Sequence, residues 1–216
     1  MSLDNGFDSL DILHYSTTTK QYLVMRQKNK NKTVAFRSSI FVNGKLRCIF
    51  PNYPITNEEF KVKVDIKQCQ FEEYIKGTML SYFYNGSEWI WSTTSMPLIN
   101  ETKEYHNTLL IKQLPDLSSI MTLDLSLSLY FILSTNELFY IHATMFTTIN
   151  NKHRIVTEQY RNLFKPIYNI ISLPPRYEVA NGLRIDDIVN YNKKVSRPKW
   201  FNGTVIKCNG YTTILK

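Results

Sequence analysis

The chain has 216 residues, of which 43% are hydrophobic and 20% charged, proportions that are ordinary for a folded globular protein and argue against intrinsic disorder. Its 26 Lys and Arg residues outnumber its 18 Asp and Glu residues, and the formal net charge of +8 favours an acidic partner such as a nucleic acid, a nucleotide or an anionic surface. The mean hydropathy of -0.27 and the lack of a long apolar run exclude a membrane-spanning helix.

Cysteine and histidine spacing shows neither a metal site nor a disulfide framework. The three cysteines, Cys48, Cys69 and Cys208, are far apart and odd in number, so they cannot all pair within one chain. None of the four histidines stands at a spacing typical of metal ligands. Because reduced cysteines suit a reducing compartment and the first residues do not resemble a secretory signal, we expect a cytoplasmic or nuclear protein.

The first 32 residues are polar and basic. Residues 1–19 contain turn-forming Asp, Asn and Gly and indicate a loosely attached lead-in. Residues 20–32 are rich in Lys and Arg and read as a solvated loop, with contact to nucleic acid as the alternative. No change of composition marks a boundary further along, so we expect residues 33–216 to form one domain on which residues 1–32 pack.

Apolar and aromatic runs, some of them alternating with polar residues, then predict a series of β-strands. The predicted strands cover residues 33–42, 45–50, 60–66, 69–84, 88–93, 126–133 and 137–146. Asn43-Gly44 and Asn85-Gly86 each separate two of these strands. They indicate tight hairpins, because Asn and Gly accept the positive φ of a type I′ turn.

Helices are predicted mainly in the second half of the chain. Residues 102–121 favour one helix or two short ones, and an apolar stripe predicts the longest helix over residues 154–171. A short helix over residues 185–192 precedes a final Asn-Gly hairpin of residues 204–208 and 211–215.

Six short segments stand out for the residue types that they combine and for their order. They are Phe36-Arg37-Ser38-Ser39-Ile40-Phe41, Glu73-Tyr74-Ile75-Lys76-Gly77-Thr78, Ser92-Thr93-Thr94-Ser95, Phe131-Ile132, Asn202-Gly203-Thr204-Val205-Ile206-Lys207 and Ile214-Leu215-Lys216. In this order they resemble the motifs of the adenylation domain of ATP-dependent RNA ligases, in the covalent nucleotidyltransferase superfamily. The resemblance extends over residues 33–216. It implies an α+β fold, with two antiparallel β-sheets and flanking helices that enclose a nucleotide cleft.

The second of these segments departs from the family pattern at the reacting group. The resemblance places Tyr74 where the family has the lysine that attacks the α-phosphate of ATP, and Lys76 where it has an aspartate, whereas Glu73 and Gly77 fit. The covalent step needs an amine that can lose its proton, and a tyrosine with a pKa of about 10 does not simply replace it. Lys76 is the alternative nucleophile, because residues two apart on a strand share a face.

Other groups that the family uses are replaced as well. Ile132 stands in place of the carboxylate that holds the ribose, and Asn202 in place of the glutamate that supports the metal ion. The nucleotide-binding residues that the resemblance implies are Arg37, Glu73, Tyr74, Lys76, Gly77, Phe131, Lys207 and Lys216. We expect no metal ligand, and ATP with Mg²⁺ only if activity survives through Lys76.

A separate basic cluster near the end of the chain suits contact with nucleic acid. Its members, Lys193, Lys194, Arg197 and Lys199, precede two aromatic residues, and cations beside aromatic rings can bind phosphates and stack on bases. The alternative is an ordinary charged loop before a buried tryptophan.

These observations lead to one functional hypothesis and two alternatives. The chain is expected to be a catalytically degenerate RNA-ligase-like domain that binds RNA, a nucleotide or a protein partner, with no membrane partner. The first alternative is an active ATP-dependent polynucleotide ligase or nucleotidyltransferase that uses Lys76 as its nucleophile. The second is a basic β-rich assembly protein.

Overall fold

In the computed structural model the chain folds into two units, each built on antiparallel β-sheet with short helices. The first unit comprises Met1–Asn52 and Thr78–Ser172, and the second comprises Tyr53–Gly77 and Leu173–Lys216. The structure describes residues 10–28, 37–63, 65–98, 114–118, 124–135, 137–147, 152–164, 171–178, 184–194, 203–208 and 211–215. Among the residues that the structure describes, the strands of each sheet pair antiparallel and short helices lie between them, which confirms the α+β class.

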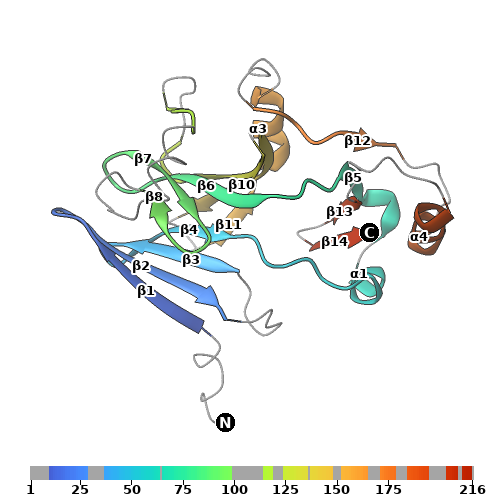
Figure 1. Ribbon diagram of the computed structural model, residues 1–216, viewed down its shortest axis with the longest axis horizontal. Helices are drawn as coiled ribbons and strands as arrows, with labels where there is room; N and C mark the ends of the chain where they lie inside the picture. The colour runs from blue at the N-terminus through green and yellow to red at the C-terminus, as the bar shows by residue number, and fades with distance from the viewer. Residues whose placement is uncertain are drawn as a thin grey trace, which may run out of the picture. The chain divides into compact units, whose positions relative to one another are not determined.

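The first unit begins with a four-stranded antiparallel sheet (Figure 1). Its strands, in chain and spatial order, are β1 (Leu10–Ser16), β2 (Gln21–Gln27), β3 (Ser38–Val42) and β4 (Lys45–Phe50). Asn43 and Gly44, between β3 and β4, have φ values of 48° and 74°. Both residues therefore have the positive φ that the sequence predicted for this hairpin.

β1 and β2 correct the prediction of a loose lead-in and a basic loop. All seven residues of β1 pair with β2. Leu13 and Tyr15 of β1 pack against the core of the unit. Tyr22 and Val24 of β2 are buried within that core. The sequence did not predict these strands because polar residues interrupt the apolar alternation and because the turn between the two strands lacks an Asn-Gly pair.

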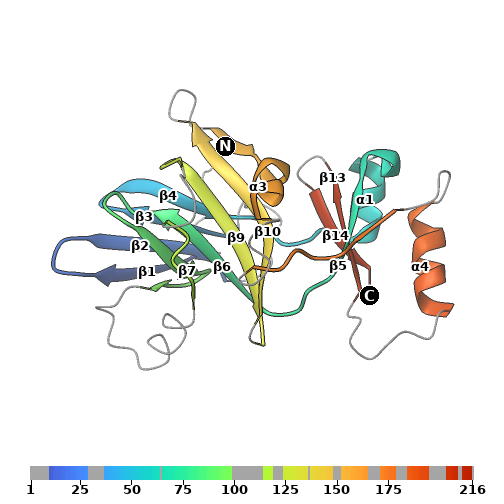
Figure 2. The ribbon, with the colours of Figure 1, turned by 90° about the horizontal axis from the view of Figure 1, so that it is seen from above.

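A six-stranded antiparallel sheet completes the first unit. Its strands are β6 (Thr78–Tyr84), β7 (Trp89–Thr93), β8 (Pro97–Leu98), β9 (Leu127–Ser134), β10 (Glu137–Thr147) and β11 (Lys152–Ile155). Their spatial order is β11-β10-β9-β6-β7-β8, and Figure 2 shows β9 and β10 side by side. The strands predicted over residues 88–93, 126–133 and 137–146 are confirmed.

Helix α3 (Thr157–Phe164) packs against β10. The prediction began this helix too early, because residues 154 and 155 belong to β11. The Tyr140 hydroxyl donates to the carbonyl oxygen of Thr157 at 2.9 Å and ties the start of α3 to the sheet. The other predicted helix, residues 102–121, lies outside the described residues except for 114–118, which are not helical.

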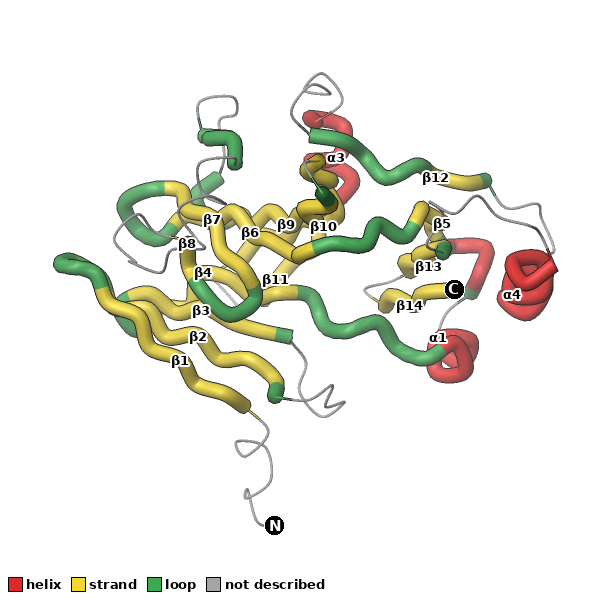
Figure 3. Tube along the Cα trace, viewed as in Figure 1, coloured by secondary structure: helices red, strands yellow, loops and turns green. Residues whose placement is uncertain are grey.

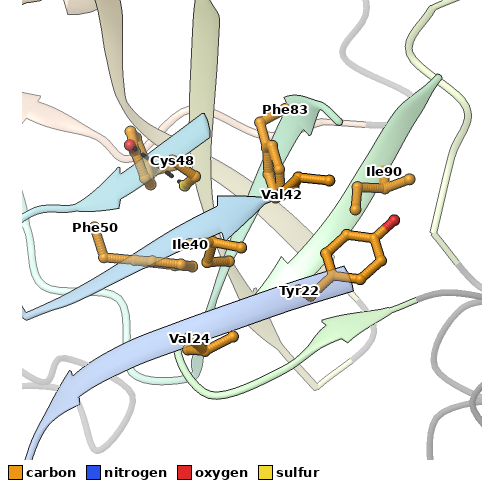
Figure 4. Packing of buried hydrophobic residues seen from close by; sticks show 9 residues of the cluster. Tyr22, Val24, Ile40, Val42, Cys48, Phe50, Phe83 and Ile90 are labelled. Carbon is orange, nitrogen blue, oxygen red and sulfur yellow. Dashed lines mark hydrogen bonds between the residues drawn. The ribbon is translucent and has the colours of Figure 1, made fainter. Parts of the chain in front are cut away.

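The two sheets of the first unit share an apolar core (Figure 4). Buried side chains of the four-stranded sheet meet those of the six-stranded sheet: Tyr22, Val24, Ile40, Val42, Cys48, Phe50, Phe83, Ile90 and Tyr130. Burying each large apolar side chain of this kind stabilises the fold by about 1.5–3 kcal/mol. The Tyr130 hydroxyl donates to the carbonyl oxygen of Ile49 at 2.5 Å and so links the sheets through a polar contact.

Aromatic rings form a row on the other face of the six-stranded sheet. The row consists of Tyr82, Trp89, Trp91, Phe131 and Tyr140, with neighbouring ring centroids 4.8–5.8 Å apart. Residues 114–118 contact the row: Trp91 Nε1 donates to the carbonyl oxygen of Pro115 at 3.0 Å, and the Tyr82 hydroxyl donates to Asp116 Oδ1 at 2.9 Å. The polar ends of the Tyr82 and Trp91 side chains therefore have partners, as burial of Tyr and Trp requires.

The second unit is a four-stranded antiparallel sheet with helices. Its elements are α1 (Asn57–Lys63), η2 (Ile66–Gln68), β5 (Gln70–Glu73), β12 (Arg176–Tyr177), α4 (Ile185–Lys194), β13 (Thr204–Cys208) and β14 (Tyr211–Leu215). The sheet order is β12-β5-β13-β14. Its core combines Phe60 of α1 and Ile185 of α4 with Phe71, Ile206, Cys208 and Leu215 of the sheet. The predicted short helix and the final hairpin are confirmed.

Helix α1 corrects the strand predicted over residues 60–66. Thr56 and Glu59 form a capping box: the Glu59 N–H donates to Thr56 Oγ1 at 3.3 Å, and the Thr56 N–H donates to Glu59 Oε2 at 3.1 Å. This Thr-x-x-Glu pattern is visible in the sequence and is a helix-start signal that the apolar alternation outweighed. None of the described helices is both long enough and apolar enough to cross a membrane.

Candidate functional site

The sheet of the second unit has one apolar face and one charged face. Phe71 of β5 and Ile206 of β13 are paired in the register and belong to the core with α1 and α4. Because successive strand residues point to opposite sides, Glu72 and Lys207 lie on the other face. Arg176 of β12 is paired with Glu72 and shares that face. Strand alternation thus places three charged side chains, which we call the Glu72 trio, on one side of the sheet.

Glu72 joins the two cations of the trio. Arg176 Nε donates to Glu72 Oε1 at 3.0 Å, and Lys207 Nζ donates to Glu72 Oε2 at 2.5 Å. The Glu72 side chain is 2% exposed, against 34% for Arg176 and 18% for Lys207. A carboxylate buried this deeply needs compensation by opposite charge and hydrogen bonds. With two cations and one carboxylate, the trio carries a formal charge of +1.

The trio has the chemistry of an anion-binding group. Ammonium and guanidinium groups carry several N–H donors, so each can bind a phosphate oxygen while it remains paired with a carboxylate. Glu72 at the same time lowers the positive potential that an incoming phosphate meets. The arrangement therefore favours reversible contact with an anion.

β5 ends at Glu73, so the expected nucleophile position, residue 74, lies just beyond the strand. Figure 3 shows the segment that follows as a loop between β5 and β6. The Tyr74 N–H donates to the carbonyl oxygen of Gly203 at 2.8 Å, and Tyr74 is half-buried, whereas Lys76 and Gly77 are exposed. The expectation that Tyr74 and Lys76 share one face of a strand is wrong, because the strand reaches neither residue.

Gly203, just before β13, and Glu73, at the end of β5, flank this loop. Gly203 has a φ of 131°, a conformation that residues with a Cβ rarely adopt, which gives this glycine a backbone role at the start of β13. Glu73 is the last residue of β5 and is paired with Thr204. Burial raises the pKa of the Glu73 carboxyl, because its charged form loses hydration.

Arg37 and Phe131 belong to the first unit. Arg37 is half-buried just before β3, with Nη1 4.0 Å from the sulfur of Met79. Phe131 is fully buried in the aromatic row, where its ring centroid lies 5.1 Å from that of Trp91 and 5.8 Å from that of Tyr140. Their nucleotide-binding roles stay predictions.

The basic cluster is described only in part. Lys193 and Lys194 are the last two residues of α4. Arg197, Lys199 and Lys216 lie outside the described residues. The role of this cluster in binding nucleic acid therefore also stays a prediction.

Sequence reasoning did not identify Glu72 and Arg176. Their partners are distant along the chain: Arg176 lies 104 residues from Glu72, and Lys207 lies 135 residues from it. The available signal was a single charged residue next to Phe71 on a short strand, which is also typical of a solvent-facing strand position.

The charged face does not fit a Mg²⁺ site of the kind that the family resemblance implies. Mg²⁺ binds carboxylate oxygens, but both oxygens of Glu72 accept hydrogen bonds from cations, which repel a metal ion. Among the residues that the structure describes, no group of three or more His, Cys, Asp or Glu side chains is placed to hold a metal.

Comparison with known proteins identifies the fold. No protein-family model matches the chain, and no curated protein sequence matches it. A solved archaeal ATP-dependent RNA ligase (form 1) is similar in structure, with a TM-score of 0.59, 14% sequence identity and 94% of this chain covered. The chain spans 57% of the length of that ligase chain. The chain therefore has the fold of an RNA-ligase-like nucleotidyltransferase domain.

Proposed function

We propose that the chain is a catalytically degenerate RNA-ligase-like domain that binds RNA through its phosphates without forming a covalent nucleotide intermediate. In this proposal residues 33–216 carry the nucleotidyltransferase-like framework, to which residues 1–32 contribute strands. The observation that carries the proposal is the Glu72 trio: Lys207, the cation retained from the family pattern, is paired with a buried carboxylate.

The position of Tyr74 supports the loss of covalent chemistry. A phenol with an ordinary pKa of about 10 is a poor substitute for the attacking amine. Lys76 is exposed and lies on a loop, whereas in-line attack requires a nucleophile held to within about 1 Å of its productive position. Loss of either the reactive amine or its positioning slows the covalent reaction, and loss of both slows it further.

The charge balance supports RNA as the ligand. The chain has a formal charge of +8 and the trio contributes +1 of it, so binding can rest on many phosphate contacts instead of one strong pocket. Contacts of this kind need neither a metal ion nor a nucleophile.

Charge-neutralising variants test the binding role of the trio. In fluorescence anisotropy with labelled single-stranded RNA, Lys207→Gln should weaken binding and reduce the slope of log Kd against log salt by about 0.7, the value for one phosphate contact. Glu72→Gln should strengthen binding, because it removes the opposing charge. The matched controls are Lys45→Gln, an equal change at an exposed residue of the first unit, and Glu58→Gln, an equal change at an exposed residue of α1.

The binding proposal fails if the Lys207 and Glu72 variants bind RNA like their controls while remaining folded by circular dichroism. If the unmodified chain retains no RNA at low salt, a protein partner becomes the better explanation of the retained fold.

Covalent labelling tests the loss of catalysis. The protein is incubated with α-labelled ATP or GTP and Mg²⁺ and then denatured. We expect no label to remain attached. An adduct that disappears in Lys76→Ala but persists in Lys67→Ala, a control on the same unit, would establish the active-ligase alternative instead.

A further inference from the structure

Cys69, the residue before β5, and Cys208, the last residue of β13, lie close together in the second unit. In the register of β5 and β13, Gln70 is paired with Lys207. The next position outward places Cys69 opposite Cys208. Cross-strand neighbours in an antiparallel sheet have Cα atoms about 4.5–5.5 Å apart, inside the span of about 4.4–6.8 Å that a disulfide bridges.

The sulfur atoms of Cys69 and Cys208 both contact the carbonyl oxygen of Asp65. Cys69 Sγ donates to the carbonyl oxygen of Asp65 at 3.3 Å, and Cys208 Sγ points to that same oxygen at 3.8 Å. Cys208 is buried and Cys69 is half-buried, so a dissolved oxidant reaches Cys69 first.

We propose that Cys69 and Cys208 are a thiol modification site that forms a reversible disulfide by exchange with a small-molecule disulfide such as oxidised glutathione. The Cys69 thiolate attacks one sulfur of the oxidant, whose S–S bond breaks and releases one thiolate. The Cys208 thiolate then attacks Cys69 Sγ in this mixed disulfide and expels the second. Two thiols lose two electrons, the oxidant gains them, and the two protons pass to the released thiolates.

The environment makes this exchange selective but slow. Burial, the neighbouring Cys208 thiol and the charge of Asp65 raise the pKa of Cys69 to about 12, so its thiolate is scarce near neutral pH. Cys48 is fully buried in the first unit, where its thiol donates to Ser81 Oγ at 3.5 Å, and it is not part of the site. The disulfide would join the beginning of β5 to the end of β13, the two strands that carry Glu72 and Lys207.

Thiol counting on the full chain tests the site. The reduced protein is treated with oxidised glutathione at mildly alkaline pH, its remaining thiols are alkylated after denaturation, and the products are identified by mass spectrometry. We expect the number of alkylated cysteines to fall from three to one, and peptide mapping to find Cys69 linked to Cys208. A reducing agent should restore all three thiols.

Variants separate this result from other reactions. Cys48→Ser should leave the disulfide unchanged, and Cys69→Ser should abolish it while the half-buried site tolerates the change. A glutathione adduct that persists on Cys69, a disulfide that includes Cys48, or no reaction of the folded chain would each overturn the proposal. None of these readouts depends on RNA binding, so the two proposals can fail separately.

Discussion

The two units differ in what lies on the two faces of their β-sheets. In the first unit, one face of the six-stranded sheet packs against a second sheet and the other carries a row of aromatic rings. In the second unit, one face packs against helices and the other carries the Glu72 trio. Buried ion pairs are often no more stabilising than apolar side chains of the same shape. This is consistent with the binding role that we propose for the charged face.

The largest expected effect comes from the aromatic row. Phe131→Ala leaves a cavity between Trp91 and Tyr140 and should lower the free energy of unfolding by about 3–5 kcal/mol. Urea unfolding measures the loss, and hydrogen exchange should localise it to the first unit. Phe131→Leu is the milder control. Equal loosening of both units would contradict the view that each has its own core.

Cys48 makes the stability of the first unit depend on alkaline pH. Burial raises its pKa to about 11 from an ordinary value of 9.0. Above pH 9 the unfolded chain releases this proton while the folded chain keeps it, so the free energy of unfolding falls by about 1.4 kcal/mol per pH unit until pH 11. Cys48→Ala should remove this part of the slope. Parallel pH profiles for the two proteins would show that the thiol is not held in its neutral form.

The Glu72 trio tests what the second unit gains from its charged face. Glu72→Gln removes the charge that balances Arg176 and Lys207, and it should cost about 1–3 kcal/mol, below the range for fully buried pairs because both cations are partly exposed. The control is Glu73→Gln: burial already raises the pKa of Glu73, so neutralising it should not destabilise the fold. Thermal unfolding compares them. If Glu72→Gln and Glu73→Gln lower stability equally, the effect comes from their position in the sheet and not from the ion pairs of Glu72.

The smallest effect is expected at the capping box of α1. Thr56→Ala removes the oxygen that accepts the Glu59 N–H and should cost about 1 kcal/mol. Thr56→Ser keeps the cap and should remain close to the parent protein in chemical denaturation. If the alanine and serine variants unfold alike, the packing of Phe60 and not the cap holds α1 in place.

Prediction from sequence succeeded where the signal was local. The Asn43-Gly44 turn and the strands beside it follow from residues that need positive φ and from apolar alternation. The same reasoning failed at residues 60–66, where alternation suggested a strand and the Thr56 and Glu59 pair started a helix. It also failed at β1, whose stability comes from pairing with β2 more than from its own composition.

By itself the sequence determined local features such as the Asn43-Gly44 turn and the strands on either side of it. Tertiary structure alone decided that Glu72 meets Arg176 and Lys207, and that two distant cysteines share one carbonyl oxygen. The physical reason is strand order. Partners across a sheet are chosen by which strands pair, and this depends on burying the apolar faces of the whole unit together.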